Sequence, residues 1–179
     1  MHKAGLSEIF ALLPEQAQGN ALICALELLF ARGEWPQIND LHEQVMRLKG
    51  HDQFRAQALA IQIKAAIRLR QFDLAFEWYC LLLELGQSDK NICLQVETLW
   101  QMAIQILPAR ADKLSSLWML FLAADMPNDG LQLWAKTGNL LVEAFAKNQA
   151  EARARQIIEA MREKLPEPFW SVAAQKLKK

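Results

Sequence analysis

Residues 134–141 read Trp-Ala-Lys-Thr-Gly-Asn-Leu-Leu, with large apolar residues at both ends and a glycine in the fifth position. Apolar or small residues recur at the first, fifth and eighth positions of three upstream stretches. These are Leu22, Leu26 and Leu29; Leu59, Ile63 and Ala66; and Val96, Trp100 and Ala103. The first members of successive triplets are 37, 37 and 38 residues apart. A helical repeat of this length predicts an α-solenoid, in which neighbouring units share a continuous core.

The composition is that of a folded protein. The chain has 179 residues and a hydrophobic content of 53%, which favours a packed domain over disorder. Twenty basic and twenty acidic side chains cancel, and residues 151–179 carry a net charge of only +3. Such a weak basic end does not indicate a nucleic-acid-binding surface. The N-terminal apolar stretch is broken by Glu8 and ends at Pro14. We therefore expect a cytoplasmic protein with no membrane insertion.

Helix signals dominate the chain. Gly33, Gly50 and Gly86 each follow an apolar helical pattern and are expected to mark helix ends. No stretch of useful length alternates between apolar and polar residues as a half-buried strand does. We expect an all-α fold with helices near residues 4–13, 16–32, 36–49, 53–70, 73–86, 90–107, 111–126, 129–147, 149–164 and 167–177.

The repeating unit resembles a degenerate tetratricopeptide repeat. The fourth unit fits best, through Trp134, Gly138, Leu141, Ala154, Ile158 and Pro166, and the second unit contributes Phe72, Ala75 and Tyr79. The resemblance implies a single domain over residues 1–179, an α-solenoid of about four antiparallel helix pairs with a C-terminal capping helix. The repeats are expected at residues 19–50, 56–87, 93–126 and 131–166, and the cap at 167–179. A helical bundle without repeats is the alternative.

Motifs that carry chemistry are scarce. The sequence contains no glycine-rich phosphate loop, no Cys-x-x-Cys and no His-Glu-x-x-His. Cys24, Cys80 and Cys93 lie among apolar residues and are expected to be buried free thiols with a structural role. We expect His42 on a helix surface. The tryptophans recur at repeat positions, which predicts packing, with Trp35 the most exposed. The sequence therefore predicts neither an enzyme nor a metal or cofactor site.

The family resemblance also implies a binding surface. In tetratricopeptide proteins the first helix of each pair lines a concave face. The corresponding polar positions here are Asn20, Glu27, Gln57, Lys64, Arg68, Glu97, Gln101, Gln105, Asn139 and Glu143, with Phe30, Ile67, Ile104 and Val142 as apolar positions between them. Amides can hydrogen-bond a partner's backbone and apolar pockets can take its side chains, so the implied ligand is a peptide or helix of a partner protein.

These features favour a non-enzymatic protein-binding scaffold or adaptor. By analogy of fold, bacterial secretion-system chaperones of similar size are one possible class. The alternative is a structural subunit of a larger or homo-oligomeric assembly without a ligand groove. It rests on two second helices that read as apolar on every side. Their residues are Tyr79, Leu81, Leu82, Leu83, Leu117, Met119, Leu120 and Phe121. Nucleic-acid binding through Arg153, Arg155, Arg162, Lys164 and the terminal lysines is a further, less favoured alternative.

Overall fold

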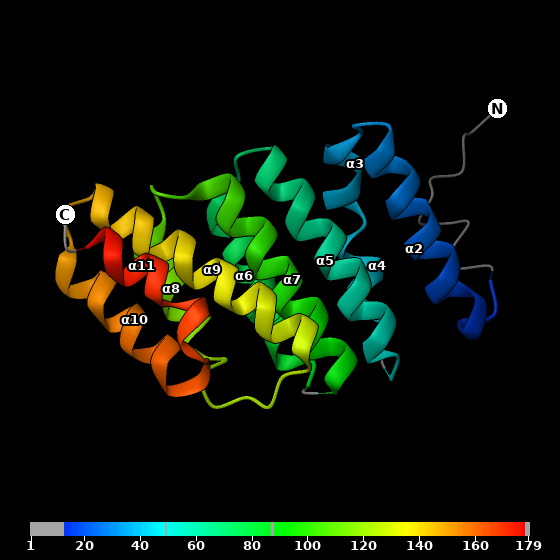
Figure 1. Ribbon diagram of the computed structural model, residues 1–179. Helices are drawn as coiled ribbons and strands as arrows, with labels where there is room; N and C mark the ends of the chain where they lie inside the picture. The colour runs from blue at the N-terminus through cyan, green and yellow to red at the C-terminus, as the bar shows by residue number, and fades with distance from the viewer. Residues whose placement is uncertain (1–12, 49, 87, 178–179) are drawn as a thin grey trace. The chain divides into compact units, whose positions relative to one another are not determined.

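The computed structural model describes residues 13–48, 50–86 and 88–177, and all regular secondary structure within these ranges is helical (Figure 1). The prediction of an all-α fold is confirmed for these residues. The helix expected at 4–13 lies almost wholly outside them. The chain forms two compact units, Met1–Gln95 and Val96–Lys179. Each unit is described below by itself.

The helices of the first unit are α2 (Glu15–Ala31), α3 (Trp35–Asp40), α4 (His42–Arg47), α5 (Asp52–Arg68) and α6 (Phe72–Glu84). The boundary between the units falls within α7 (Asp89–Ile106). The second unit continues with α8 (Ala111–Met119), α9 (Asn128–Lys147), α10 (Glu151–Lys164), the 3₁₀ helix η1 (Glu167–Phe169) and α11 (Ser171–Lys176). The predicted helices 16–32, 53–70, 73–86, 90–107, 129–147 and 149–164 agree with these bounds to within about two residues.

Three predicted helices differ from the structure. In place of the single helix expected over 36–49, the structure has α3 and α4, separated at Leu41, whose N–H bonds to the carbonyl three residues back. The helix expected over 111–126 ends at Met119, because the following N–H groups also bond to carbonyls three residues back, which tightens the chain into turns. The C-terminal segment begins as η1, since Pro166 and Pro168 donate no hydrogen bond and restrict the residues before them.

Three glycines end helical segments as predicted. Gly33, Gly50 and Gly86 have φ values of 72°, 80° and 93°. This left-handed conformation strains residues that carry a Cβ atom and is the usual way to stop a helix.

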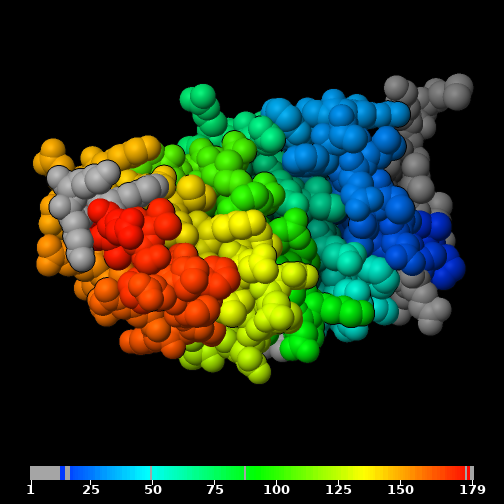
Figure 2. Space-filling view, viewed as in Figure 1, coloured from blue at the N-terminus to red at the C-terminus, as the bar shows by residue number. Residues whose placement is uncertain are grey.

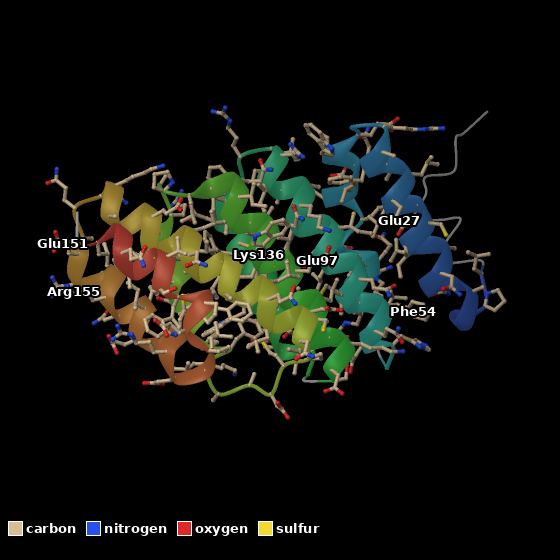
Figure 3. All side chains as sticks on the ribbon, viewed as in Figure 1. Glu27, Phe54, Glu97, Lys136, Glu151 and Arg155 are labelled. Carbon is tan, nitrogen blue, oxygen red and sulfur yellow. The ribbon has the colours of Figure 1, made fainter. Side chains whose placement is uncertain are left out.

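In the first unit, α5 is the central helix and contacts α2, α3, α4 and α6. Its buried face is rich in alanine, with Ala56, Ala65 and Ala66 fully buried. The approach of α2 is also close, because a Cβ atom at Gly19 would lie 2.6 Å from the ring of Phe54, labelled on α5 in Figure 3. Small residues on both helices therefore let α2 pack tightly against α5.

The buried side chain of Gln62 connects α5 to α3 and α4. Its Nε2 donates to the carbonyl oxygen of Ile38 at 3.0 Å, and its Oε1 lies 3.0 Å from Nδ1 of His42. Because Oε1 can only accept, we assign a proton to Nδ1 of His42. The imidazole is half-buried and stacks on Trp78 at a centroid distance of 4.7 Å. The prediction of a surface histidine is therefore wrong.

Tyr79 and Gln95 join α6 to the first half of α7 by two reciprocal hydrogen bonds. The Tyr79 hydroxyl donates to the carbonyl oxygen of Gln95 at 2.7 Å, and Gln95 Nε2 donates to that of Leu82 at 2.9 Å. Burial raises the pKa of the Tyr79 hydroxyl well above its usual value, so the phenol keeps the proton that it donates.

In the second unit, Trp118 on α8 and Trp134 on α9 form a reciprocal pair. Their rings stack with centroids 4.1 Å apart and planes 7° from parallel, and both residues are fully buried. Trp118 Nε1 donates to the carbonyl oxygen of Trp134 at 2.8 Å, and Trp134 Nε1 donates to that of Trp118 at 3.1 Å. Each indole therefore has its polar group satisfied in the core, which removes the main cost of burying tryptophan.

Gly138 lies where α8, α9 and α10 meet. A Cβ atom added at Gly138 would be 2.8 Å from Cζ2 of Trp118 and 2.9 Å from Sδ of Met161. Real Cβ atoms do not tolerate such distances, so the absence of a side chain on α9 allows both neighbouring helices to approach. Gly138 is therefore the small residue that close helix crossings require.

The tryptophans pack as predicted, but the cysteines do not. Trp78, Trp118 and Trp134 are buried, and Trp35, Trp100 and Trp170 are half-buried, so Trp35 is among the more exposed tryptophans without being fully exposed. Cys24 and Cys80 are exposed and Cys93 is half-buried. The prediction of buried thiols is wrong because apolar neighbours in sequence lie on other faces of the same helix. Leu22 and Leu26 point into the core on either side of Cys24.

We predict that Gly138→Val destabilises the protein by about 2–3 kcal/mol, because the new side chain must displace a stacked indole that has no space to move. The matched control is Lys136→Val on the exposed face of the same helix, which we expect to stay within about 0.5 kcal/mol of the parent. Urea unfolding followed by circular dichroism measures both. Equal stability of the two variants would show that Gly138 is not a packing constraint.

Candidate docking groove between α8 and α10

A groove of about 710 Å³ lies on the second unit between α8 and α10. Both helices contact α9, which lies beneath them. Buried Phe145, Ile157 and Ala160 form the apolar floor. Among the residues that the structure describes, the lining consists of Ser115, Ser116, Met119, Leu122, Phe145, Ala152, Arg153, Arg155, Gln156, Ile157, Glu159, Ala160 and Glu163.

Hydrogen bonds at the two ends show that α8 and α10 run in the same direction. Asn148, just before α10, donates through Nδ2 to the carbonyl oxygen of Pro108, just before α8, at 3.4 Å. At the other end, Lys164, the last residue of α10, donates to the carbonyl oxygen of Phe121, just after α8, at 3.0 Å. The N-terminal ends of both helices therefore lie at one end of the groove and the C-terminal ends at the other.

The α8 wall is less polar than its sequence suggests. The hydroxyl groups of Ser115 and Ser116 both donate to the carbonyl oxygen of Asp112, at 2.8 and 3.1 Å. Met119 follows them along the groove, and its side chain is 39% exposed. A flexible thioether beside serines that already donate internally suits contact with apolar side chains of varied shape.

Charged side chains stand on the α10 side of the groove. Arg155 and Glu151, both labelled in Figure 3, form an ion pair at 3.5 Å, and Glu159 pairs with Arg162 at 2.7 Å. Arg153 donates to the Oε1 atom of Gln156 at 3.5 Å. The groove therefore combines an apolar floor with a polar rim, the distribution found in protein-binding surfaces.

Lys164 holds the C-terminal end of the groove together. Its ammonium group donates to the carbonyl oxygens of Phe121 (3.0 Å), Leu122 (2.8 Å) and Ala124, in the turns that follow α8. Partial burial lowers the pKa of the Lys164 ammonium from its usual value, and the carboxylate of Asp125 opposes this shift. These bonds satisfy carbonyl groups left free where α8 ends and hold Leu122 in the lining.

The C-terminal segment covers another part of the second unit. α11 contacts α9 and α10, and its red atoms lie over them in Figure 2. The guanidinium of Arg162 lies 4.4 Å from the centre of the Trp170 ring, and Asn139 Nδ2 donates to the carbonyl oxygen of Phe169 at 3.2 Å.

The polar positions predicted on the first helices lie in both units. In the first unit Asn20, Glu27 and Arg68 are exposed and Gln57 and Lys64 are half-buried, with Asn20 and Glu27 on α2 and the others on α5. These two helices, α2 and α5, pack against each other. Their role in partner binding stays a prediction.

In the second unit, Glu97 and Gln105 are exposed on α7 and Gln101 is half-buried. Asn139 and Glu143 on α9 are also half-buried, and the Asn139 side chain donates to the carbonyl oxygen of Phe169 in the C-terminal segment.

The apolar positions predicted for the concave face, in both units, differ in their exposure. Ile104 is exposed and Phe30 half-buried, but Ile67 and Val142 are buried and belong to the core.

Reasoning from the sequence missed the α8–α10 groove because it assigned binding to the first helix of each pair. Two signals in the second helices were available. Ala152, Gln156, Glu159 and Glu163 follow one another at helical spacing and form a stripe that is too polar for the core. Met119 belonged to a segment that was too apolar for a single buried face.

No protein-family model, curated protein or solved structure matches this chain. The tetratricopeptide resemblance therefore stays a prediction. None of the helices described is long and apolar enough to cross a membrane. Within the described ranges, no three side chains of histidine, cysteine, aspartate or glutamate gather in a way that could hold a metal ion.

We predict that Lys164→Met loosens the turns after α8, because three backbone carbonyls lose their shared donor. Amide hydrogen exchange over residues 120–125 should accelerate by about tenfold, a local change that exchange detects directly. The control is Lys147→Met, an exposed lysine at the end of α9, which should leave this segment unchanged. Unaltered exchange in Lys164→Met would show that the lysine does not hold the groove's end.

Proposed function

We propose that the protein is a non-enzymatic adaptor that binds a helix or peptide of a partner protein, and that the α8–α10 groove is its docking surface. The observation that carries the proposal is the apolar floor of Phe145, Ile157 and Ala160 between two helices. A helix docks in such a groove by placing one apolar face against the floor and its polar face toward the solvent.

The size of the groove fits a short helix. The lining on α10 runs from Ala152 to Glu163, which corresponds to about 17 Å at a rise of 1.5 Å per residue. A partner helix of about three turns would match that length. The exposed side chain of Met119 adapts to different partners more readily than a branched residue does.

Our proposal includes a repeat architecture of stacked antiparallel helix pairs. Its support is a hydrogen bond that recurs along the chain. Tyr79 on α6 donates to the carbonyl oxygen of Gln95, and Trp118 on α8 donates to that of Trp134, each across 16 residues. The two donors and the two acceptors are both separated by 39 residues. One aromatic donor per repeat is expected when successive pairs pack alike.

The first-helix surface remains a second possible location for the same function. Lys64 and Arg68 on α5 lie one helical turn apart and give it a basic character. A chaperone of the secretion-system class would use either surface to shelter a partner segment, and this assignment rests on analogy of fold alone.

The second candidate function is a structural subunit of a homo-oligomer. Leu120 is 62% exposed beside Met119, which is the observation that favours it. The other members of the same apolar segment, Leu117 and Phe121, are buried, so most of its apolar character is used within the fold. We favour the adaptor because two exposed residues make a small apolar patch.

The adaptor proposal predicts that helical peptides bind in the groove. A display library of amphipathic helices of about 18 residues, selected against the whole chain, should yield binders whose affinity falls about tenfold or more in Ser116→Trp. Ser116 is exposed in the lining, so an indole at this position fills the groove without entering the core. Fluorescence polarisation measures the affinities.

Two further variants locate the binding site. Lys136→Trp adds the same side chain to an exposed position of α9 outside the lining and should leave the affinity unchanged. Binders that tolerate Ser116→Trp but are lost in the Lys64→Glu, Arg68→Glu double variant would place the site on the first helices. A library that yields no binders would contradict the adaptor function.

Light scattering separates the two candidate functions. We expect a monomer of 20.4 kDa at micromolar concentration. A larger mass that returns to the monomer in Leu120→Asp would instead support the homo-oligomeric subunit.

A further inference from the structure

We propose that the α8–α10 groove selects and orients its partner helix by charge, with acidic residues of the partner beside Arg153 and basic residues beside Glu163. The inference rests on the proposed function and adds the chemistry of the partner. Both side chains belong to the groove lining, and both are exposed. They are separated by 10 residues on one helix, or about 15 Å along its axis.

The charges of α10 that line the groove stand in the opposite order to those that do not line it. Glu151 is in the first turn and Arg162 in the last turn, and neither lines the groove. Lys164, also in the last turn, is not in the lining and is bonded to the carbonyls that follow α8 at the groove's C-terminal end. Each of these matches the helix dipole, whose N-terminal end is positive and whose C-terminal end is negative. In the groove the order is opposite, because Arg153 is near the N-terminal end and Glu163 near the C-terminal end. These two charges are unfavourable for α10 itself.

Arg153 and Glu163 are placed against the dipole of α10, which suggests that these charges serve an interaction with another molecule. Local rules of stability are most often broken at functional sites, where another interaction offsets the loss. Arg155 and Glu159 also line the groove, but they are engaged in ion pairs with Glu151 and Arg162. Arg153 and Glu163 therefore determine the difference in side-chain charge between the two ends of the groove lining.

The direction of the helices reinforces this difference. Because α8 and α10 run in the same direction, two helix N-terminal ends lie near Arg153 and two C-terminal ends near Glu163. At the first end their dipoles add to the positive charge of Arg153. At the second end the carbonyls that follow α8 are bonded to the Lys164 ammonium, so the negative field comes from Glu163 and the C-terminal end of α10. A partner helix with acidic residues at one end and basic residues at the other, about 10 residues apart, complements this field.

The proposal is tested with a designed amphipathic peptide that is acidic at one end and basic at the other and carries a nitroxide spin label at its acidic end. Relaxation enhancement of backbone amide signals should be strongest near Ala152 and Arg153 in the parent protein. In the double variant Arg153→Glu, Glu163→Arg the label should move to the Ala160–Lys164 end. Each single variant should weaken binding by about threefold to fivefold, as expected for exposed charges at an interface rim.

The double variant should also be more stable than the parent, with a melting temperature higher by about 2–4 °C, since both new charges match the dipole of α10. The control exchanges charges outside the groove on the same helix, in Glu151→Arg, Arg162→Glu. It should lower the melting temperature and leave the label near Ala152.

The outcomes distinguish the inference from the function on which it rests. A label that stays at the same end in the double variant, or a melting temperature that falls in it, overturns the orientation by charge. If such a peptide and its uncharged glutamine analogue bind equally and lose affinity in Ser116→Trp, the docking groove stands and only the inference fails. If neither peptide nor any library binder is bound by the groove, both proposals fail.

Discussion

The absence of a side chain at Gly138 is the constraint on which the second unit depends. Trp118 from α8 and Met161 from α10 both occupy the space that a Cβ atom would need. The indole of Trp118 cannot withdraw, because it is stacked on Trp134 and its Nε1 donates to the carbonyl oxygen of Trp134. The Trp134 indole donates in return to the carbonyl oxygen of Trp118. The glycine makes a helix less stable by itself, and here this loss is offset by the packing of three helices at one point.

This packing also creates the groove. α9 serves as a common support for α8 and α10, and Lys164 ties the end of α10 to the turns after α8. The ammonium of Lys164 also lies 5.9 Å from the centre of the Trp134 ring, so the same cation is close to the stacked pair. The groove's floor and its C-terminal end therefore depend on the contacts that hold the core, so the proposed docking surface is formed by the fold itself. Such preorganisation favours binding because little conformational freedom is lost.

Helical periodicity predicted most elements because it records which side of a helix is buried. Leu22, Leu59, Val96 and Trp134, the first members of the four repeated triplets, are all buried. The break at Leu41 was not predictable in this way, because it depends on a local turn. The early end of α8 was not predictable either, because the turns that follow it are bonded to Lys164, which lies 43 residues after Phe121 and 42 after Leu122. The thiol of Cys24 shows the same limit, because neighbours in sequence on a helix point in different directions.

The candidate groove was harder to predict than the fold, for a physical reason. A buried position needs an apolar side chain, and this requirement is visible in a single sequence. A docking surface needs a particular combination of residues from different helices, and Ser115 of α8 shares nothing with the α10 stripe of Gln156 and Glu163 except that the fold brings them together. What distinguishes two of the lining residues is that their charges are unfavourable for the helix on which they lie. Arg153 and Glu163 oppose the dipole of their own helix, whereas Glu151, Arg162 and Lys164, which do not line the groove, agree with it. In our proposal this reversed order of charges marks the docking surface, a signal that hydrophobic periodicity does not contain.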